Sequence, residues 1–340
     1  MRNSGIEVLR ILAACFVIVL HYHEIAGGFG GGKFNMLVLD FMESFSICAV
    51  NIFVAITGYF MINSQKRTVG KMLSLLFQVS LINFSLYVFS IAIGNSSLTF
   101  VQLIQNVVPH NYFVILYVVM YLFSPYVNLL INGLTQKGRK RFLYISIGLF
   151  SLWPSFVNFS GELLHIQWFG LSSIGAWGSQ KGFTIVNFLL LYSIGACLRL
   201  ESFVIKKSII SITVCILAIF TWALICKTIV LNGSNSAWEY HNPLVILLAV
   251  MLLNYFKELP IRSGIINNLA KAAFFCYLIH YYILTHLRIP YYINQSITLM
   301  IGHVVISILF IYMISWGLFS LYEKTIGRLF SKLDSIIIKY

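Results

Sequence analysis

Residues 7–22 read EVLRILAACFVIVLHY, an almost wholly apolar run with Arg10 near its start and His21 near its end. A helix needs roughly 20 apolar residues to cross a membrane, and the surrounding run 6–26 reaches that length. A charged side chain at the centre of such a helix costs at least ~2.5–3.5 kcal/mol on insertion scales. The stretch therefore predicts a first transmembrane helix. Arg10 and His21 are costly within it unless each has a hydrogen-bonding or ionic partner or a functional role.

The rest of the chain has the same apolar character. Of its 340 residues, 59% are hydrophobic and only 10% are charged, and the mean hydropathy is +0.87. A soluble domain carries about 25% charged residues, so this chain cannot cover itself with a water-facing surface. Its net charge of +13 is spread over short loops instead of one polar face, which excludes a nucleic-acid binder. We expect one all-α transmembrane domain over residues 1–340.

The N-terminal run has features of a signal peptide, but it lacks a clear small-x-small cleavage site and contains Arg10. We therefore expect an uncleaved first helix. The six cysteines all lie within apolar runs and form no C-x-x-C pair, so we expect neither a disulfide framework nor a metal cluster.

Ten apolar runs are candidate spans, and the charges of their loops indicate an orientation. With a cytoplasmic N-terminus, nineteen of the 23 Lys and Arg residues fall on inner segments, and only Lys33, Lys181, Lys227 and Arg288 fall outside. Such a bias is typical of the positive-inside rule. The sequence thus predicts an integral membrane protein with about ten transmembrane helices and both termini in the cytoplasm. The runs are 6–26, 40–62, 70–94, 112–132, 141–159, 183–200, 208–229, 242–257, 267–288 and 296–321.

Arg10 and His21 share one face of the first helix. They are eleven positions apart, which is three turns plus about 20° at 100° per residue. Their separation along the axis is roughly 16 Å. Glu7 precedes Arg10 by three residues and can pair with it, whereas His23 points about 220° away from Arg10.

This face suits two kinds of chemistry. An arginine binds phosphate, and a histidine titrates near neutrality and can take a proton from a hydroxyl. Two simpler interpretations stay open. Glu7 and Arg10 can form an interfacial ion pair, and His21 can be hydrogen-bonded between helices without any chemical role.

An arginine followed after ten residues by a histidine on a first helix resembles the membrane-bound acyltransferase 3 family, the O-acyltransferases of bacterial polysaccharides and lipid-linked sugars. Other segments resemble further motifs of this family, and they occur in the same order along the chain. Residues 50–60 (VNIFVAITGYF) resemble the family's V-D-x-F-F-x-x-S-G-F/Y pattern, and 66–71 its basic inner loop. Residues 110–113 (HNYF) resemble its His-x-Trp-Phe, and 273–280 (AFFCYLIH) its Y-S-x-Y-L-x-H segment. The departures, such as Asn51 for an acid and Tyr112 for tryptophan, are chemically mild.

The resemblance implies a multi-pass protein of the bacterial cytoplasmic membrane that uses acetyl-CoA, or another acyl-CoA, as donor co-substrate, with no bound cofactor. The acceptor would be a capsular, exopolysaccharide or lipid-linked sugar, and the partners would be membrane lipid and enzymes of glycan assembly. The expected roles are catalysis by His21 as general base with Arg10 and Glu7, donor binding by Arg10, Arg67, Lys66 and Lys71, and substrate or tunnel contacts by His280, Tyr277, His110 and Asn51.

Three other features of the sequence bear on its function. A transporter of polysaccharide or lipid-linked sugar is the alternative function, because buried polar residues fit it equally, although the order of the motifs favours the enzyme. The run His21-Tyr22-His23-Glu24 offers no metal site, since histidines two apart diverge on a helix and no H-E-x-x-H is present. The glycine-rich segment 27–34 lacks the Ser or Thr that follows the lysine of a phosphate loop.

Overall fold

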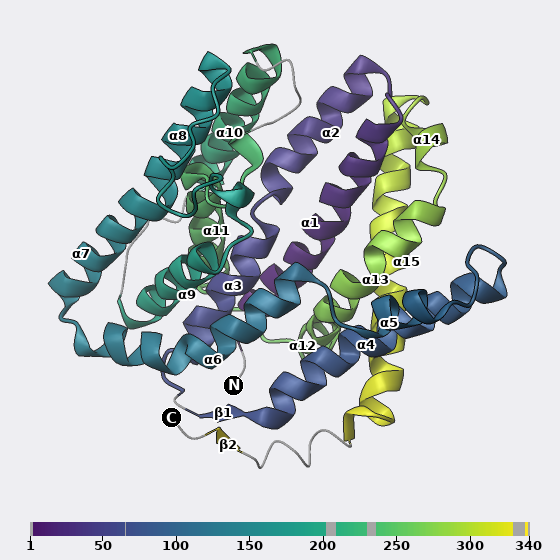
Figure 1. Cartoon of the computed structure of the whole chain (residues 1–340), viewed down its shortest axis with the longest axis horizontal. Helices are drawn as coiled ribbons and strands as arrows, with labels where there is room; N and C mark the ends of the chain where they lie inside the picture. The colour runs from purple at the N-terminus through teal and green to yellow at the C-terminus, as the bar shows by residue number, and fades with distance from the viewer. Residues whose placement is uncertain (1–2, 65, 202–208, 230–235, 329–336, 339–340) are drawn as a thin grey trace.

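The computed structural model describes residues 3–64, 66–201, 209–229, 236–328 and 337–338, and these are overwhelmingly helical (Figure 1). In chain order the elements are α1 (Ser4–Gly28), α2 (Lys33–Ser46), α3 (Ala49–Met61), β1 (Arg67–Thr68), α4 (Val69–Ala92), α5 (Phe100–Val107), α6 (Tyr112–Gly133), α7 (Gln136–Ile147), η1 (Gly148–Leu152), α8 (Trp153–Leu164), η2 (Gln180–Gly182), α9 (Ile185–Leu200), α10 (Ile209–Ile229), η3 (Ser236–Trp238), α11 (Pro243–Phe256), α12 (Gly264–Leu269), η4 (Ala270–Ala272), α13 (Ala273–His286), α14 (Ile289–Tyr292), α15 (Ile297–Lys324) and β2 (Ile337–Ile338).

The helices confirm an all-α membrane protein. Within the described residues, eight segments are long and apolar enough to cross a bilayer. The other two predicted spans, 183–200 and 267–288, coincide with the shorter helices α9 and α13. The total of ten spans and the cytoplasmic termini therefore stay predictions. The eight segments are Ser4–Gly28, Lys33–Met61, Val69–Ala92, Tyr112–Gly133, Gln136–Leu164, Ile209–Thr228, Ser236–Phe256 and Ile297–Lys324.

Several predicted spans are interrupted, which the apolar pattern did not indicate. The run 40–62 divides between α2 and α3, and 267–288 is made of α12, η4 and α13. The run 141–159 contains the single π-helical turn η1 between α7 and α8. A continuous apolar sequence is compatible with a straight helix or a broken one, because the breaks depend on what packs against the segment.

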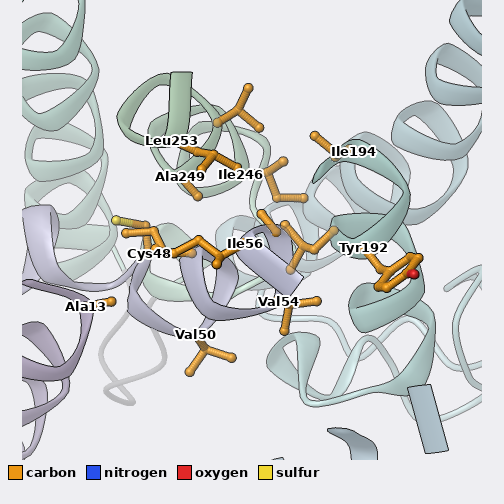
Figure 2. Close-up of a cluster of buried hydrophobic side chains, with 14 of the residues drawn as sticks. Ala13, Cys48, Val50, Val54, Ile56, Tyr192, Ile194, Ile246, Ala249 and Leu253 are labelled. Atoms are coloured by element: carbon orange, nitrogen blue, oxygen red, sulfur yellow. The ribbon is translucent and has the colours of Figure 1, made fainter. Parts of the chain in front are cut away.

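The tightest helix crossing joins α3 to α9, and two glycines make it possible. A Cβ on Gly58 would lie 2.0 Å from the backbone oxygen of Tyr192, and one on Gly195 would lie 2.0 Å from that of Ala55. Small residues let membrane helices approach closely enough to pack backbone against backbone. Figure 2 shows the apolar core around this crossing, where Val54 and Ile56 of α3 lie beside Tyr192 and Ile194 of α9.

Helix α1 runs through the middle of the bundle and packs against α2, α3, α11, α13 and α15. Its N-cap Asn3 accepts hydrogen bonds from the backbone of Gly5 and Ile6 and donates one to the Lys257 carbonyl at 2.6 Å. The last contact ties the start of α1 to the end of α11. The position of α1 next to α13 decides where its polar face points.

One small β-pair closes an end of the molecule. Strand β1 pairs antiparallel with β2, with Arg67 opposite Ile338 and Thr68 opposite Ile337. Figure 1 shows this pair at the same end as the last turns of α15. The pair therefore places residues 337–338 beside the start of α4.

Candidate active site

The polar face of α1 is turned toward α13. Arg10 lines a cavity together with Tyr277 of α13. Further along α1, the ring centre of His21 lies 4.8 Å from that of His280 and 5.4 Å from that of Tyr281. The helices α1 and α13 pack against each other and run in the same direction (Figure 1). The shared face predicted for Arg10 and His21 is thus a face within the protein.

The cavity has a volume of about 320 Å³ and lies between α1, α3, α4, α6 and the η4–α13 segment. Ligand pockets typically measure roughly 300–1,000 Å³, so this cavity can take part of a large ligand or the whole of a small one. Its walls are mainly apolar and carry three cations. The lining residues are Arg10, Phe53, Ile56, Thr57, Phe60, Met61, Lys71, Met72, Leu75, Phe113, Tyr117, Val118, Tyr121, Ala270, Lys271, Ala273, Phe274 and Tyr277.

The three cations of the cavity differ in their surroundings. Arg10 Nη1 lies 3.1 Å from Glu7 Oε2, and the Glu7 side chain is only 1% exposed. Lys271 Nζ lies 2.9 Å from Glu323 Oε1, where both side chains are partly exposed. Lys71 Nζ stands 5.6 Å from the centre of the Tyr121 ring. The cavity therefore presents more positive than negative charge, which suits an anionic group attached to an apolar chain.

Two histidines meet where α1 passes the middle of α13. His21 Nδ1 lies 2.6 Å from Glu24 Oε2 on its own helix. His280 is 4% exposed, and its Nδ1 lies 2.7 Å from the Tyr277 carbonyl oxygen. A carbonyl only accepts, so Nδ1 of His280 carries the hydrogen. Its Nε2 has no hydrogen-bond partner among the described residues, which leaves a buried acceptor beside His21.

Tyr277 separates this histidine pair from the cavity. It lines the cavity, and its ring centre lies 5.9 Å from that of His280. Its hydroxyl donates to Asn111 Oδ1 at 2.6 Å, and the same oxygen accepts from the Phe113 backbone at the start of α6. The N-cap of α6 thereby holds Tyr277 in place between the cations and the histidines.

The other predicted site residues lie elsewhere. Arg67 is 1% exposed and is not among the residues that line the cavity, while Lys66 is exposed and its carbonyl accepts from Arg67 Nη1 at 2.9 Å. Asn51 is buried and donates from Nδ2 to the Tyr240 carbonyl at 2.8 Å. His110 is exposed, with Nδ1 3.0 Å from the Val108 carbonyl oxygen.

The structure adds two residues that the sequence analysis did not assign to the site, Lys271 and Glu24. In the sequence, Lys271 is one of the predicted inner cations and precedes Tyr277 and His280 on the same predicted segment. Glu24 follows His21 by three residues, a spacing that permits an i,i+3 pair. Both spacings were visible in the sequence, but neither indicated which faces would be buried together.

A family model described as an acyltransferase domain (Acyl_transf_3) matches residues 3–319. The match runs from the N-cap of α1 into α15 and contains every residue of the cavity and both histidines. No curated protein and no solved structure matches the chain.

Proposed function

The chain belongs to this family of membrane acyltransferases, and on that premise we propose that it transfers an acetyl or other short acyl group from acyl-CoA to a hydroxyl of a cell-surface or exported glycan. One observation on this chain's own residues supports the proposal in addition to the family match. Tyr277 lines the cavity together with Arg10, Lys71 and Lys271. The ring centre of Tyr277 lies 5.9 Å from that of His280, which in turn lies 4.8 Å from that of His21.

The cavity suits the donor. An acyl-CoA joins phosphate groups to a long, largely apolar arm with a thioester at its tip. Arg10, Lys71 and Lys271 would bind the phosphates, and the apolar wall from Phe53 to Phe274 would accommodate the arm. All three cations belong to segments that the charge distribution assigns to the cytoplasm. The donor would therefore enter from the cytoplasmic side. Arg67 and Lys66, which the sequence also assigns to donor binding, do not line the cavity.

His21 would act as the general base. As the acceptor oxygen attacks the thioester carbonyl, its proton passes to the imidazole and a C–O bond forms. The C–S bond then breaks, and the departing thiolate of CoA receives the proton from the imidazolium. The products are an ester and free CoA, so the step needs no other co-reactant. Tyr277 and His280 would line the route between the thioester and the acceptor.

The acceptor is proposed from the family resemblance and from the position of His21. The charge distribution places His21 toward the outer half of the membrane, where a lipid-linked or exported sugar can approach. This acceptor implies a bacterial cytoplasmic membrane and neighbouring enzymes of glycan assembly.

Inverted membrane vesicles that carry the host glycan in their lumen and are supplied with radiolabelled acetyl-CoA test the proposal. Label should reach the glycan as a base-labile ester, and His21→Ala should abolish the transfer while the protein remains inserted. Arg10→Gln should raise KM for acetyl-CoA by about 10- to 100-fold, because a hydrogen bond to a charged group contributes about 1.5–3 kcal/mol.

The matched control is Lys137→Gln, which removes an exposed cation at the start of α7, away from the cavity. Its KM should change less than twofold. A glycan that is exported without label, and whose export fails in His21→Ala, would contradict acyl transfer and favour the transporter.

A further inference from the structure

The outer end of α1 carries two histidines, His21 and His23, only two residues apart. The sequence alone does not say which of them can accept a proton. The structure distinguishes them by the number of carboxylates that each ring contacts. A neutral imidazole has one donor nitrogen and one acceptor nitrogen, whereas a carboxylate only accepts.

Among the residues that the structure describes, His21 contacts one carboxylate. Its Nδ1 lies 2.6 Å from Oε2 of Glu24, one helical turn later. The Glu24 side chain is 62% exposed, so it is ionised at neutral pH and accepts the hydrogen of Nδ1. The neutral ring of His21 then carries its lone pair on Nε2. This arrangement is the one in which a carboxylate orients a catalytic histidine.

His23 contacts two carboxylates from the opposite side of α1. Its Nε2 lies 2.9 Å from Asp40 Oδ1, and its Nδ1 contacts Glu43 Oε2. Both nitrogens can donate at once only if the ring is an imidazolium. Lys227 completes the cluster with Nζ 2.6 Å from Asp40 Oδ1, and the Trp238 ring centre lies 5.4 Å from that of His23. Two cations balance two anions, so the cluster is neutral as a whole.

We propose that Glu24 is the positioning residue of the acyl transfer: it holds His21 with the proton on Nδ1 and the lone pair on Nε2, whereas Asp40 and Glu43 hold His23 as an imidazolium that takes no part in proton transfer. The role in acyl transfer rests on the proposed function. The assignment of the two rings rests on the contacts alone.

The expected effect is smaller than in a buried triad. Replacing the buried aspartate of the serine-protease triad by asparagine lowers kcat by about 10⁴-fold. Glu24 is 62% exposed and lies near the end of α1, so its charge should act on His21 less strongly than that of a fully buried carboxylate. Glu24→Gln should therefore lower kcat by about 10- to 100-fold, with KM for acetyl-CoA unchanged because Glu24 does not line the donor cavity.

The test compares Glu24→Gln with Glu43→Gln in the full-length protein in vesicles. Both variants replace one carboxylate that contacts a histidine of α1, but only the first touches His21. Glu43→Gln should change kcat less than threefold. A fall in kcat of less than threefold in Glu24→Gln, or an equal fall in the two variants, would overturn the proposal.

A second measurement does not depend on activity. Diethyl pyrocarbonate modifies the unprotonated nitrogen of an imidazole, and mass spectrometry locates the modified ring. In the wild-type protein at neutral pH, His21 should be modified and His23 protected, and Glu24→Gln should slow modification of His21 several-fold. Modification of His23 as fast as that of His21 would contradict the assignment. Because this result is independent of acyl transfer, it separates failure of the ring assignment from failure of the proposed function.

Discussion

A guanidinium buried in a membrane protein needs acceptors for its donors, and Nε and Nη1 of Arg67 find them mainly in backbone oxygens. Its Nε donates to the Tyr121 carbonyl at 3.2 Å and to Ser124 Oγ at 2.7 Å. Its Nη1 donates at 2.9 Å to the carbonyls of both Ser64 and Lys66. These contacts hold the segment before β1 against α6. Arg67 thereby supports the structure at this position, and donor binding by Arg67 stays a prediction.

Arg67→Lys should destabilise the protein. A lysine retains the charge but cannot reproduce the fork of donors, so several buried carbonyls lose partners. We expect a loss of about 3 kcal/mol in the free energy of unfolding, measured as a lower thermal midpoint in detergent.

The exposed Arg141 provides the control, and Arg141→Lys should leave the midpoint unchanged. An unchanged midpoint in Arg67→Lys, together with a raised KM for acyl-CoA, would show that Arg67 binds the donor instead.

At the scale of the elements, the crossing of α3 and α9 brings two helix backbones into direct contact in the core. Each helix contributes a glycine whose absent side chain makes room for the backbone of the other, Gly58 for Tyr192 and Gly195 for Ala55. Lipid tails are as apolar as the side chains, so close packing and not the hydrophobic effect holds membrane helices together. The same helix α3 supplies Phe53 and Thr57 to the cavity, so the crossing also positions one of its walls.

Gly195→Val should separate α3 from α9. The new Cβ would lie 2.0 Å from a backbone oxygen, which cannot move without the helix. Overpacking a core costs about 1–3 kcal/mol, and we expect the upper end of that range because backbone must shift.

The loss should appear as a smaller monodisperse fraction and a lower thermal midpoint in detergent. The control is Gly302→Val on α15, where an added Cβ meets nothing within 4 Å. Equal behaviour of the two variants would argue against a tight crossing.

At the scale of the whole molecule, the cavity exists only because distant segments meet. Arg10 comes from the first helix, Lys71 from the start of α4 and Lys271 from the segment before α13. The loop charges predict that all three lie at the cytoplasmic face. The orientation therefore determines from which side a charged donor can enter, and it is itself testable.

Single cysteines at two exposed lysines, Lys33 at the start of α2 and Lys137 in α7, should report opposite sides of the membrane. In a background without the six native cysteines, an impermeant maleimide should label the residue-33 cysteine in intact cells. It should label the residue-137 cysteine only after the membrane is opened. The reverse pattern would place the cations of the cavity outside and contradict a cytoplasmic donor.

Much of the architecture was predictable from local pattern. Each apolar run partitions into lipid largely by its own composition, and backbone hydrogen bonds must be satisfied within it, so the all-α membrane fold follows from the sequence. The breaks at η1 and η4 were not predicted, because a run of apolar residues contains no signal for them.

The sequence by itself determined that Arg10 and His21 share a face, because the helical period depends only on their spacing. Only the tertiary structure decided what that face meets: a cavity with Lys71 and Lys271 at one end, and His280 beside His21 at the other. It also decided that Arg67 is buried without lining the cavity and that His23 lies between two carboxylates. The reason is physical. Burial, protonation and pairing depend on atoms from helices far apart in the chain, and no local spacing records which of them become neighbours.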